Sequence, residues 1–75
     1  MSWKYPSKKE IYVFVSSVEK ISEADKEKTN KTIEKSHRTY LTKHHLSPRS
    51  KEAKKYHEVL LIRHRARLAI QKGLV

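Results

Sequence analysis

Apolar residues in the first third of the chain recur at the spacing of a helix. Ser7 and Glu10 have the spacing of a capping box, in which the serine hydroxyl and the glutamate each satisfy a free backbone N–H, so a helix is predicted to begin there. The positions that then share one face are Ile11, Phe14, Val15, Val18 and Ile21. This stripe predicts a helix over about residues 7–21 that buries Phe14 and turns Val13 toward solvent.

The same segment has a second interpretation, because Ile11–Val15 is an unbroken run of β-branched and aromatic residues, which is typical of a strand. A strand needs a partner, and no second run of this kind follows in the chain. A helix is therefore favoured. The alternative is a strand–helix–helix chain that pairs its strand with that of a second copy and so forms a dimer.

A second helix is predicted over residues 22–45. Ser22 and Asp25 repeat the spacing of a capping residue and an acceptor three positions on. Residues 23–31 are polar all round, so this part is either the exposed start of the helix or a loop after which the helix restarts near Thr29 and Asn30. The packed part is expected at 33–45, where one face carries Ile33, His37, Tyr40, Leu41 and His44.

A third helix is predicted over residues 48–72. Pro48 fits the first turn of a helix behind a Ser47 cap, and Gly73 stands where a left-handed C-terminal cap belongs. Apolar residues lie on two flanks of this segment, with Tyr56 between them, which marks it as the core helix. One flank carries Val59, Ile62, Ala66, Ala69 and Ile70, and the other carries Ala53, Leu60, Leu61 and Leu68.

Three amphipathic segments with short connections predict an all-α fold, a small three-helix bundle that occupies residues 1–75 as a single domain. The composition agrees, since the 75 residues include one glycine and two prolines. A chain of this length buries only about 60% of its unfolded surface, so its stability is modest. It contains no cysteine, which excludes disulfides and favours an intracellular location, and no stretch has the roughly 18 apolar residues of a membrane span.

Positive charge is concentrated in the second half of the chain. Residues 1–37 hold eight lysines against six acidic residues, whereas residues 38–75 hold ten lysines and arginines against two glutamates. Arginine grips phosphate or carboxylate with two parallel hydrogen bonds, so the basic half is predicted to bind an anion. The candidate site residues are Arg38, Lys43, Arg49, Lys51, Lys54, Lys55, Arg63, Arg65 and Arg67. Arg63 and Arg67 lie one helical turn apart and form the candidate paired grip.

Other chemistry finds little support in the sequence. The five histidines stand at adjacent or seven-residue spacings and not at the three- or four-residue spacing of a helical metal-ligand pair, so no metal is predicted. The chain has no glycine-rich phosphate loop and no nucleophile motif, and its carboxylates stand among lysines, which argues against an enzyme and against a cofactor. Trp3 and Tyr5, beside Lys4, are expected to fold back on the small core rather than to bind a ligand.

These features predict a non-catalytic module whose arginine-rich C-terminal helix binds the phosphates of DNA or RNA. The alternative is a small interaction protein, an inhibitor or adaptor, that docks on an acidic surface of a protein partner.

Overall fold

The computed structural model describes residues 4–74 and contains three helices, α1 (Lys8–Ser17), α2 (Glu23–His44) and α3 (Lys51–Gln71). The predicted all-α three-helix bundle is confirmed. Residues 4–74 contain no strand, and the run Ile11–Val15 lies within α1. The alternative of a strand–helix–helix dimer is therefore wrong for this part of the chain.

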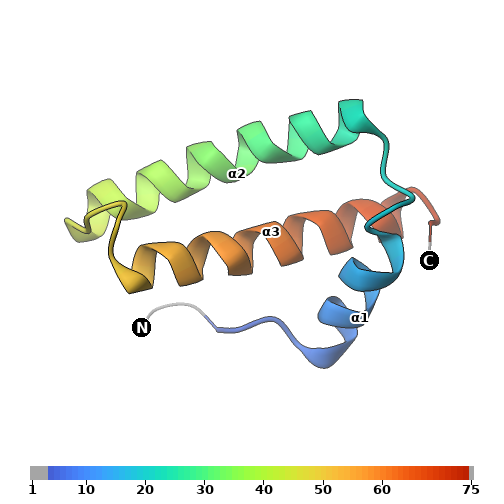
Figure 1. The fold of residues 1–75 in the computed structure, drawn as a ribbon, viewed down its shortest axis with the longest axis horizontal. Helices are drawn as coiled ribbons and strands as arrows, with labels where there is room; N and C mark the ends of the chain where they lie inside the picture. The colour runs from blue at the N-terminus through green and yellow to red at the C-terminus, as the bar shows by residue number, and fades with distance from the viewer. Residues whose placement is uncertain (1–3, 75) are drawn as a thin grey trace.

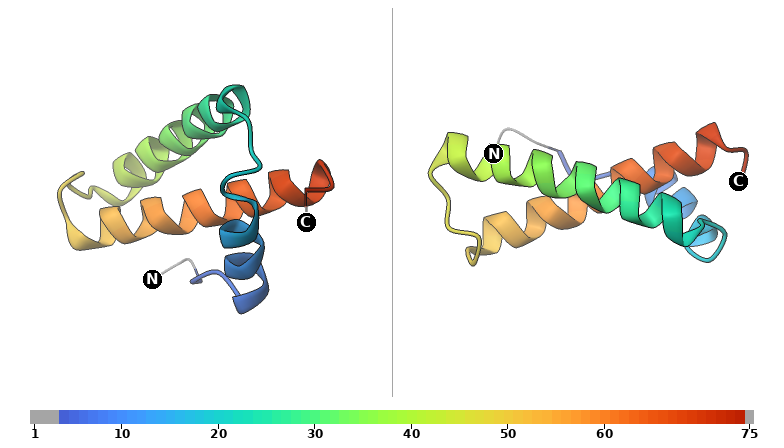
Figure 2. Two further views of the ribbon diagram at one scale, coloured as in Figure 1. Left: turned by 45° about the vertical axis from the view of Figure 1, so that its right-hand side comes forward. Right: turned by 90° about the horizontal axis from the view of Figure 1, so that it is seen from above.

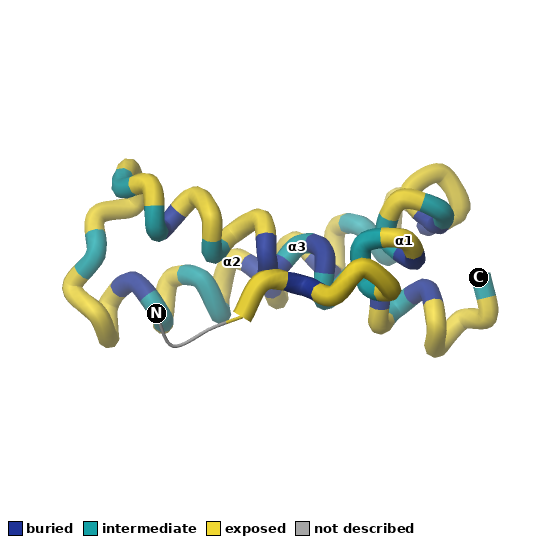
Figure 3. Tube along the Cα trace, turned by 90° about the horizontal axis from the view of Figure 1, so that it is seen from below, coloured by how far each residue is buried: buried dark blue, intermediate teal, exposed yellow. Residues whose placement is uncertain are grey.

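Helix α3 is the centre of the arrangement. It packs against α1 on one side and against α2 on the other, whereas α1 and α2 do not pack against each other within residues 4–74. The three helices consequently lie nearly in one layer, with α2 and α3 antiparallel and α1 crossing the C-terminal half of α3 (Figures 1 and 2). Buried residues follow two seams along α3, one facing each neighbour, and most other positions are exposed (Figure 3).

Helix α1 begins as the sequence predicts but ends early. The Ser7 hydroxyl accepts a hydrogen bond from the N–H of Glu10, and the Glu10 carboxylate accepts one from the N–H of Ser7, both at 3.3 Å. The helix ends at Ser17, four residues before the expected end, and Ile21 is buried outside it in the bend that precedes α2. Serine competes with the helical backbone for hydrogen bonds, and the Ser17 hydroxyl indeed donates to the carbonyl of Val13 at 2.7 Å.

The predicted buried face of α1 is only partly correct, since Ile11 and Phe14 are half-buried but the valines do not lie where the stripe placed them. Val13 is 4% exposed, whereas Val15 is 66% exposed and Val18 is also exposed. Because the whole run from Ile11 to Val15 is apolar, spacing alone could not select the inner face. The packing selects it: Val13 sits against Ala66 and Ala69 of α3, whose short side chains let the two helices approach closely.

Helix α2 is continuous from Glu23, so the interpretation with a restart near Thr29 is wrong. The Ser22 hydroxyl caps it by accepting from the N–H of Asp25 at 3.3 Å. Packing begins earlier than the predicted start at residue 33, since Thr29 is already buried and its hydroxyl donates to the Asp25 carbonyl. The helix stops at His45, which adopts a left-handed conformation with φ of 54°.

Helix α3 begins at Lys51, three residues later than predicted. Its cap is Ser50, which accepts from the N–H of Ala53 at 3.2 Å, and Pro48 belongs to the preceding turn. The predicted cap at Gly73 is present: φ is 67°, and the next residue, Leu74, donates its N–H to the carbonyl of Ala69 at 2.9 Å. Among the expected core residues of α3, Ile70 is instead 57% exposed.

The extended segment before α1 lies along α3, on the side opposite α2. Tyr5 donates its hydroxyl to Glu58 at 3.3 Å, and the Lys55 ammonium lies 5.9 Å from the centre of the Tyr5 ring. Pro6 is buried. Tyr5 therefore docks on the helical core while its own ring stays about half exposed. Trp3, which was expected to pack in the same way, lies outside the described residues.

Candidate functional site

The structure does not gather the nine predicted site residues on one face. Because α1 and α2 cover opposite sides of α3, the exposed positions of α3 form two separate edges. A rotation of 100° per residue places Arg63 and Arg67 on one edge and Lys51, Lys54 and Arg65 on the other. Arg38 and Lys43 lie on α2 and are exposed, as are Lys55 on α3 and Arg49 in the connection between the two helices.

Two of the three arginines of α3 hold the fold together. Arg63 donates a hydrogen bond to the backbone carbonyl of Lys4 and so ties the N-terminal segment to α3. Arg65 donates to the side-chain oxygen of Asn30 on α2 at 3.0 Å, and both arginines are partly buried. The Nε atom of Arg65 is buried and has no hydrogen-bond partner. The Arg65 side chain is therefore enclosed in the contact between α2 and α3. Arg67 is the exposed member of the three.

An ion pair also connects α3 and α2 along the edge that carries Arg65. The Lys72 ammonium lies 2.6 Å from the Asp25 carboxylate. This contact lowers the pKa of Asp25, chiefly through the hydrogen bond from Lys72. Lys72 thereby neutralises one of the two acidic groups in the first turn of α2, and this edge of the α2–α3 pair has a mainly structural role.

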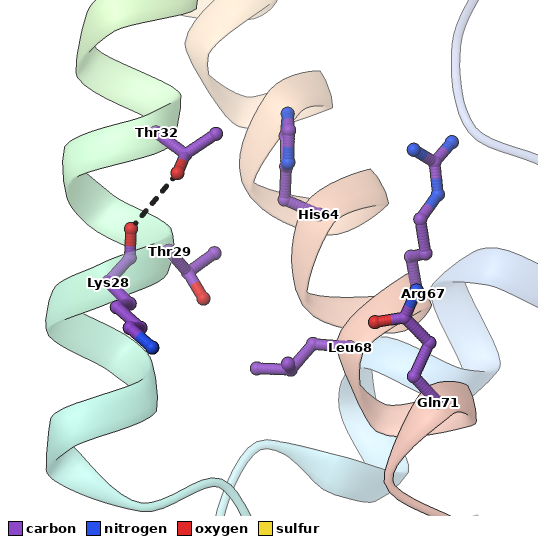
Figure 4. Close-up of a pocket in the computed structure, with 7 residues that line it drawn as sticks. All are labelled: Lys28, Thr29, Thr32, His64, Arg67, Leu68 and Gln71. Atoms are coloured by element: carbon purple, nitrogen blue, oxygen red, sulfur yellow. Dashed lines mark hydrogen bonds between the residues drawn. The ribbon is translucent and has the colours of Figure 1, made fainter.

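On the opposite edge, α2 and α3 enclose a cleft of about 360 Å³, here named the Arg67 cleft (Figure 4). One wall comes from α2 and the other from α3, with the Leu68 side chain extending from α3 toward α2. The residues that line it are Lys28, Thr29, Thr32, His64, Arg67, Leu68 and Gln71. It therefore combines two cations with the Gln71 amide, which can donate hydrogen bonds, and this combination suits an anion. The Thr29 and Thr32 hydroxyls donate within α2, to the Asp25 and Lys28 carbonyls.

A second hollow of about 480 Å³, the Tyr40 cleft, lies farther along the same pair of helices. Its lining residues are Lys35, Ser36, Thr39, Tyr40, Lys43, His44 and Tyr56. A smaller cleft of about 180 Å³ adjoins the Arg67 cleft, with which it shares His64 and Arg67, and it is completed by Leu60 and Arg63. We call these three clefts together the α2–α3 groove.

Helix α2 contributes an alternating stripe of lysine and threonine to this groove. The stripe, hereafter the Lys/Thr stripe, steps by four, three, four and four residues, which keeps its members on one side of the helix. Its members are Lys28, Thr32, Lys35, Thr39 and Lys43. All five are exposed, and none of the residues that line the groove in the described part of the chain is Asp or Glu.

The pKa of His64 depends on the charges in the groove. Partial burial lowers its pKa below the ordinary value of a histidine, and the positive charge of Arg67 lowers it further. The imidazole is therefore neutral near pH 7 and can offer either a donor or an acceptor to a ligand. A bound anion would oppose the effect of Arg67 and raise the pKa of His64, which makes this residue a reporter of occupancy.

Four rings form a ladder at the other end of the groove, in the order His37, Tyr56, Tyr40, His44. The ring centres are 6.2 Å apart for His37 and Tyr56, 3.9 Å for Tyr56 and Tyr40, and 4.4 Å for Tyr40 and His44. His37 is fixed because its Nε2 donates to the Ala53 carbonyl at 2.7 Å, and the His57 ring lies edge-on against it at 5.2 Å. The outer end is exposed, since His44 lies in the last turn of α2.

The groove contains residues that the sequence-based prediction missed. Of the nine predicted residues, Arg67, Arg63 and Lys43 line it. Its other cations, Lys28 and Lys35, belong to the part of the chain with nearly balanced charge, where composition gave no signal. The regular spacing of the Lys/Thr stripe is visible in the sequence, but only the packing shows that it borders α3.

No family model matches this chain, and neither a curated protein nor a solved structure matches it. Residues 4–74 contain no cluster of three or more histidine, aspartate or glutamate side chains placed to hold a metal ion. None of the helices in this range is long and apolar enough to cross a membrane.

Proposed function

We propose that this protein is a non-catalytic nucleic-acid-binding module that acts inside the cell and holds backbone phosphates in the α2–α3 groove. The observation that carries the proposal is the lining of the groove, where cations from two helices converge without a carboxylate. The net charge of +10 adds long-range attraction for a polyanion. Nothing in the proposal requires a cofactor.

The dimensions of the groove support a polymeric ligand rather than a single small anion. The Lys/Thr stripe runs over 15 helical steps from Lys28 to Lys43, which at 1.5 Å per residue is about 22 Å. Lysine ammonium groups neutralise phosphates as point charges. The Thr32 and Thr39 hydroxyls between them donate to the Lys28 and Lys35 carbonyls and so leave the ammonium groups as the donors to phosphate. Arg67 adds a planar donor pair on the opposite wall.

This arrangement moves the centre of the proposed site from α3 to the surface shared by α2 and α3. Lys51, Lys54 and Lys55 lie away from the groove and are assigned a long-range electrostatic role. Arg38 borders a shallow cleft beside Lys43 and can extend the basic surface around α2. Arg65 is assigned to the fold, because its side chain is engaged with Asn30.

The proposal is tested by fluorescence anisotropy with labelled DNA and RNA oligonucleotides at several salt concentrations. With about four phosphates neutralised, the logarithm of the affinity should fall by about 3 for each unit in the logarithm of salt concentration. The variant Lys28→Gln/Arg67→Gln should bind more weakly. It should also reduce the steepness of this salt dependence by about one unit for each lost phosphate contact.

The matched control is Lys9→Gln/Lys31→Gln, which removes two positive charges from exposed helical positions outside the groove. It should weaken binding much less than Lys28→Gln/Arg67→Gln. Equal losses in the two variants would show that net charge, and not the groove, binds the ligand. A lack of binding to every oligonucleotide at low salt would refute the proposal and favour the acidic surface of a protein partner.

A further inference from the structure

We propose that the groove takes single-stranded nucleic acid, with phosphates along the Lys/Thr stripe and one base stacked on His44. This inference rests on the proposed function, which it makes more specific. It is carried by the position of the ring ladder, because Tyr40, Tyr56 and His44 line the same cleft as Lys35 and Lys43.

The outer end of the ladder is the exposed ring of His44, which is tilted by 43° to the ring of Tyr40. Tyr40 and Tyr56 stack at 3.9 Å with an interplanar angle of 26°, and His44 lies against Tyr40 at 4.4 Å. The inner rings are held between α2 and α3, so the stack is ordered before a ligand arrives. A nucleobase placed on the exposed side of His44 would find a preformed aromatic surface, and aromatic stacking of this kind accepts every base.

The position of α3 argues against the recognition of duplex bases by this helix. A helix reads bases by entering a major groove about 12 Å wide, which it can do only if neighbouring elements leave it prominent. Here α1 and α2 cover opposite sides of α3 (Figure 2). In addition, the bases of a duplex are stacked on one another, so only a single strand can offer a base face to His44.

The charges around the ladder also fit a strand that follows α2. The Tyr40 hydroxyl donates to the Glu52 carboxylate at 3.3 Å, and Glu52 does not line the cleft. Phosphates are therefore drawn toward Lys35 and Lys43 and away from Glu52. The Lys/Thr stripe, about 22 Å long, suits a site at the short end of the range of about 4 to 16 nucleotides that single-strand-binding domains cover.

The test compares three labelled ligands with the same number of phosphates: oligothymidine, an oligomer of abasic deoxyribose phosphate, and a duplex. Oligothymidine should bind at least about fivefold more tightly than the abasic oligomer, the lower limit expected for one stacked base. In His44→Ala this ratio should fall toward one. In His44→Phe, which keeps a ring without a titratable charge, the ratio should persist.

His45→Gly is the matched control, because it removes the neighbouring exposed histidine, which does not line the groove. It should leave the preference for oligothymidine unchanged. Equal affinity for the abasic oligomer, tighter binding of the duplex, or equally potent competition by polyglutamate would overturn this inference. The first two results leave the proposed function standing, whereas failure of all three ligands to bind removes both.

Discussion

The contact between α1 and α3 makes a quantitative prediction about Val13. The variant Val13→Ala removes two methyl groups from a side chain that is 4% exposed. Their transfer to water costs about 1.6 kcal/mol, at about 0.8 kcal/mol each. The partners Ala66 and Ala69 are too short to fill the space, and Leu74, which packs against the same cluster, fills at most part of it, so a cavity contribution adds to this. We expect a total loss of about 2 to 3 kcal/mol in the free energy of unfolding.

The measurement is urea denaturation followed by circular dichroism, with Val15→Ala as the control. Val15 is 66% exposed on the same helix, so its replacement should change the stability by less than about 0.5 kcal/mol. For a domain of this size, the Val13 variant should melt about 8 to 24 °C lower than the unaltered protein. The dependence of unfolding on urea concentration should stay unchanged in both variants, because the surface exposed on unfolding is nearly the same.

A loss at Val15 as large as that at Val13 would refute this assignment of the inner face of α1. It would mean that the outer face, which exposes Tyr12 and Val15, is covered in solution. The cover would then be a second copy of the chain if the melting temperature rose with protein concentration. A melting temperature independent of concentration, together with a silent Val15→Ala, supports the single-chain packing described above.

Three further predictions follow from the two left-handed residues, from His64 and from the second seam. His45→Gly should stabilise the protein, and Gly73→Ala should destabilise it, each by about 1 kcal/mol, because only glycine adopts a positive φ without strain. Thermal denaturation measures both changes. The space around Gly73 is open, so steric crowding by the added methyl group is excluded as a cause. Because burial lowers the pKa of His64 in the folded protein, the free energy of unfolding should decrease as the pH falls through 6.5, the ordinary pKa of a histidine. His64→Gln should remove that part of the pH dependence, measured by urea titrations at several pH values. An unchanged pH profile in the variant would contradict this role of His64. Leu60→Ala should cost about 2 to 5 kcal/mol, and a neutral result would show that the α2–α3 seam is not packed at this point.

The helices themselves could be predicted because their ends carry local signals. Ser7, Ser22 and Gly73 act as caps in the structure as their positions suggested. The start of α3 was misplaced because Ser47 and Ser50 are both suitable caps. The chain uses Ser47 for the turn before the helix, where its hydroxyl accepts from the N–H of Arg49 at 3.3 Å, and a choice of this kind depends on where the helix must lie against α2.

The candidate site was harder to predict, because the role of a charged residue depends on its neighbours. Arg63 and Arg65 look like anion ligands in the sequence, but in the fold their guanidinium groups bind Lys4 and Asn30. These partners are 59 and 35 residues away, so no local pattern reveals them. Lys28 belongs to a segment that is polar all round, and it borders a cleft only because α3 closes the other side.

The absence of packing between α1 and α2 divides the described part of the chain into two cooperative units that share α3. The hairpin of α2 and α3 retains one complete seam when α1 detaches, whereas α1, at ten residues, is too short to stay helical alone. We therefore expect the amides of α1 to exchange with solvent through a partial opening that leaves α3 protected. Because both walls of the groove belong to the hairpin, this opening would leave the ligand bound, and ligand would slow exchange in α2 and α3 without slowing it in α1.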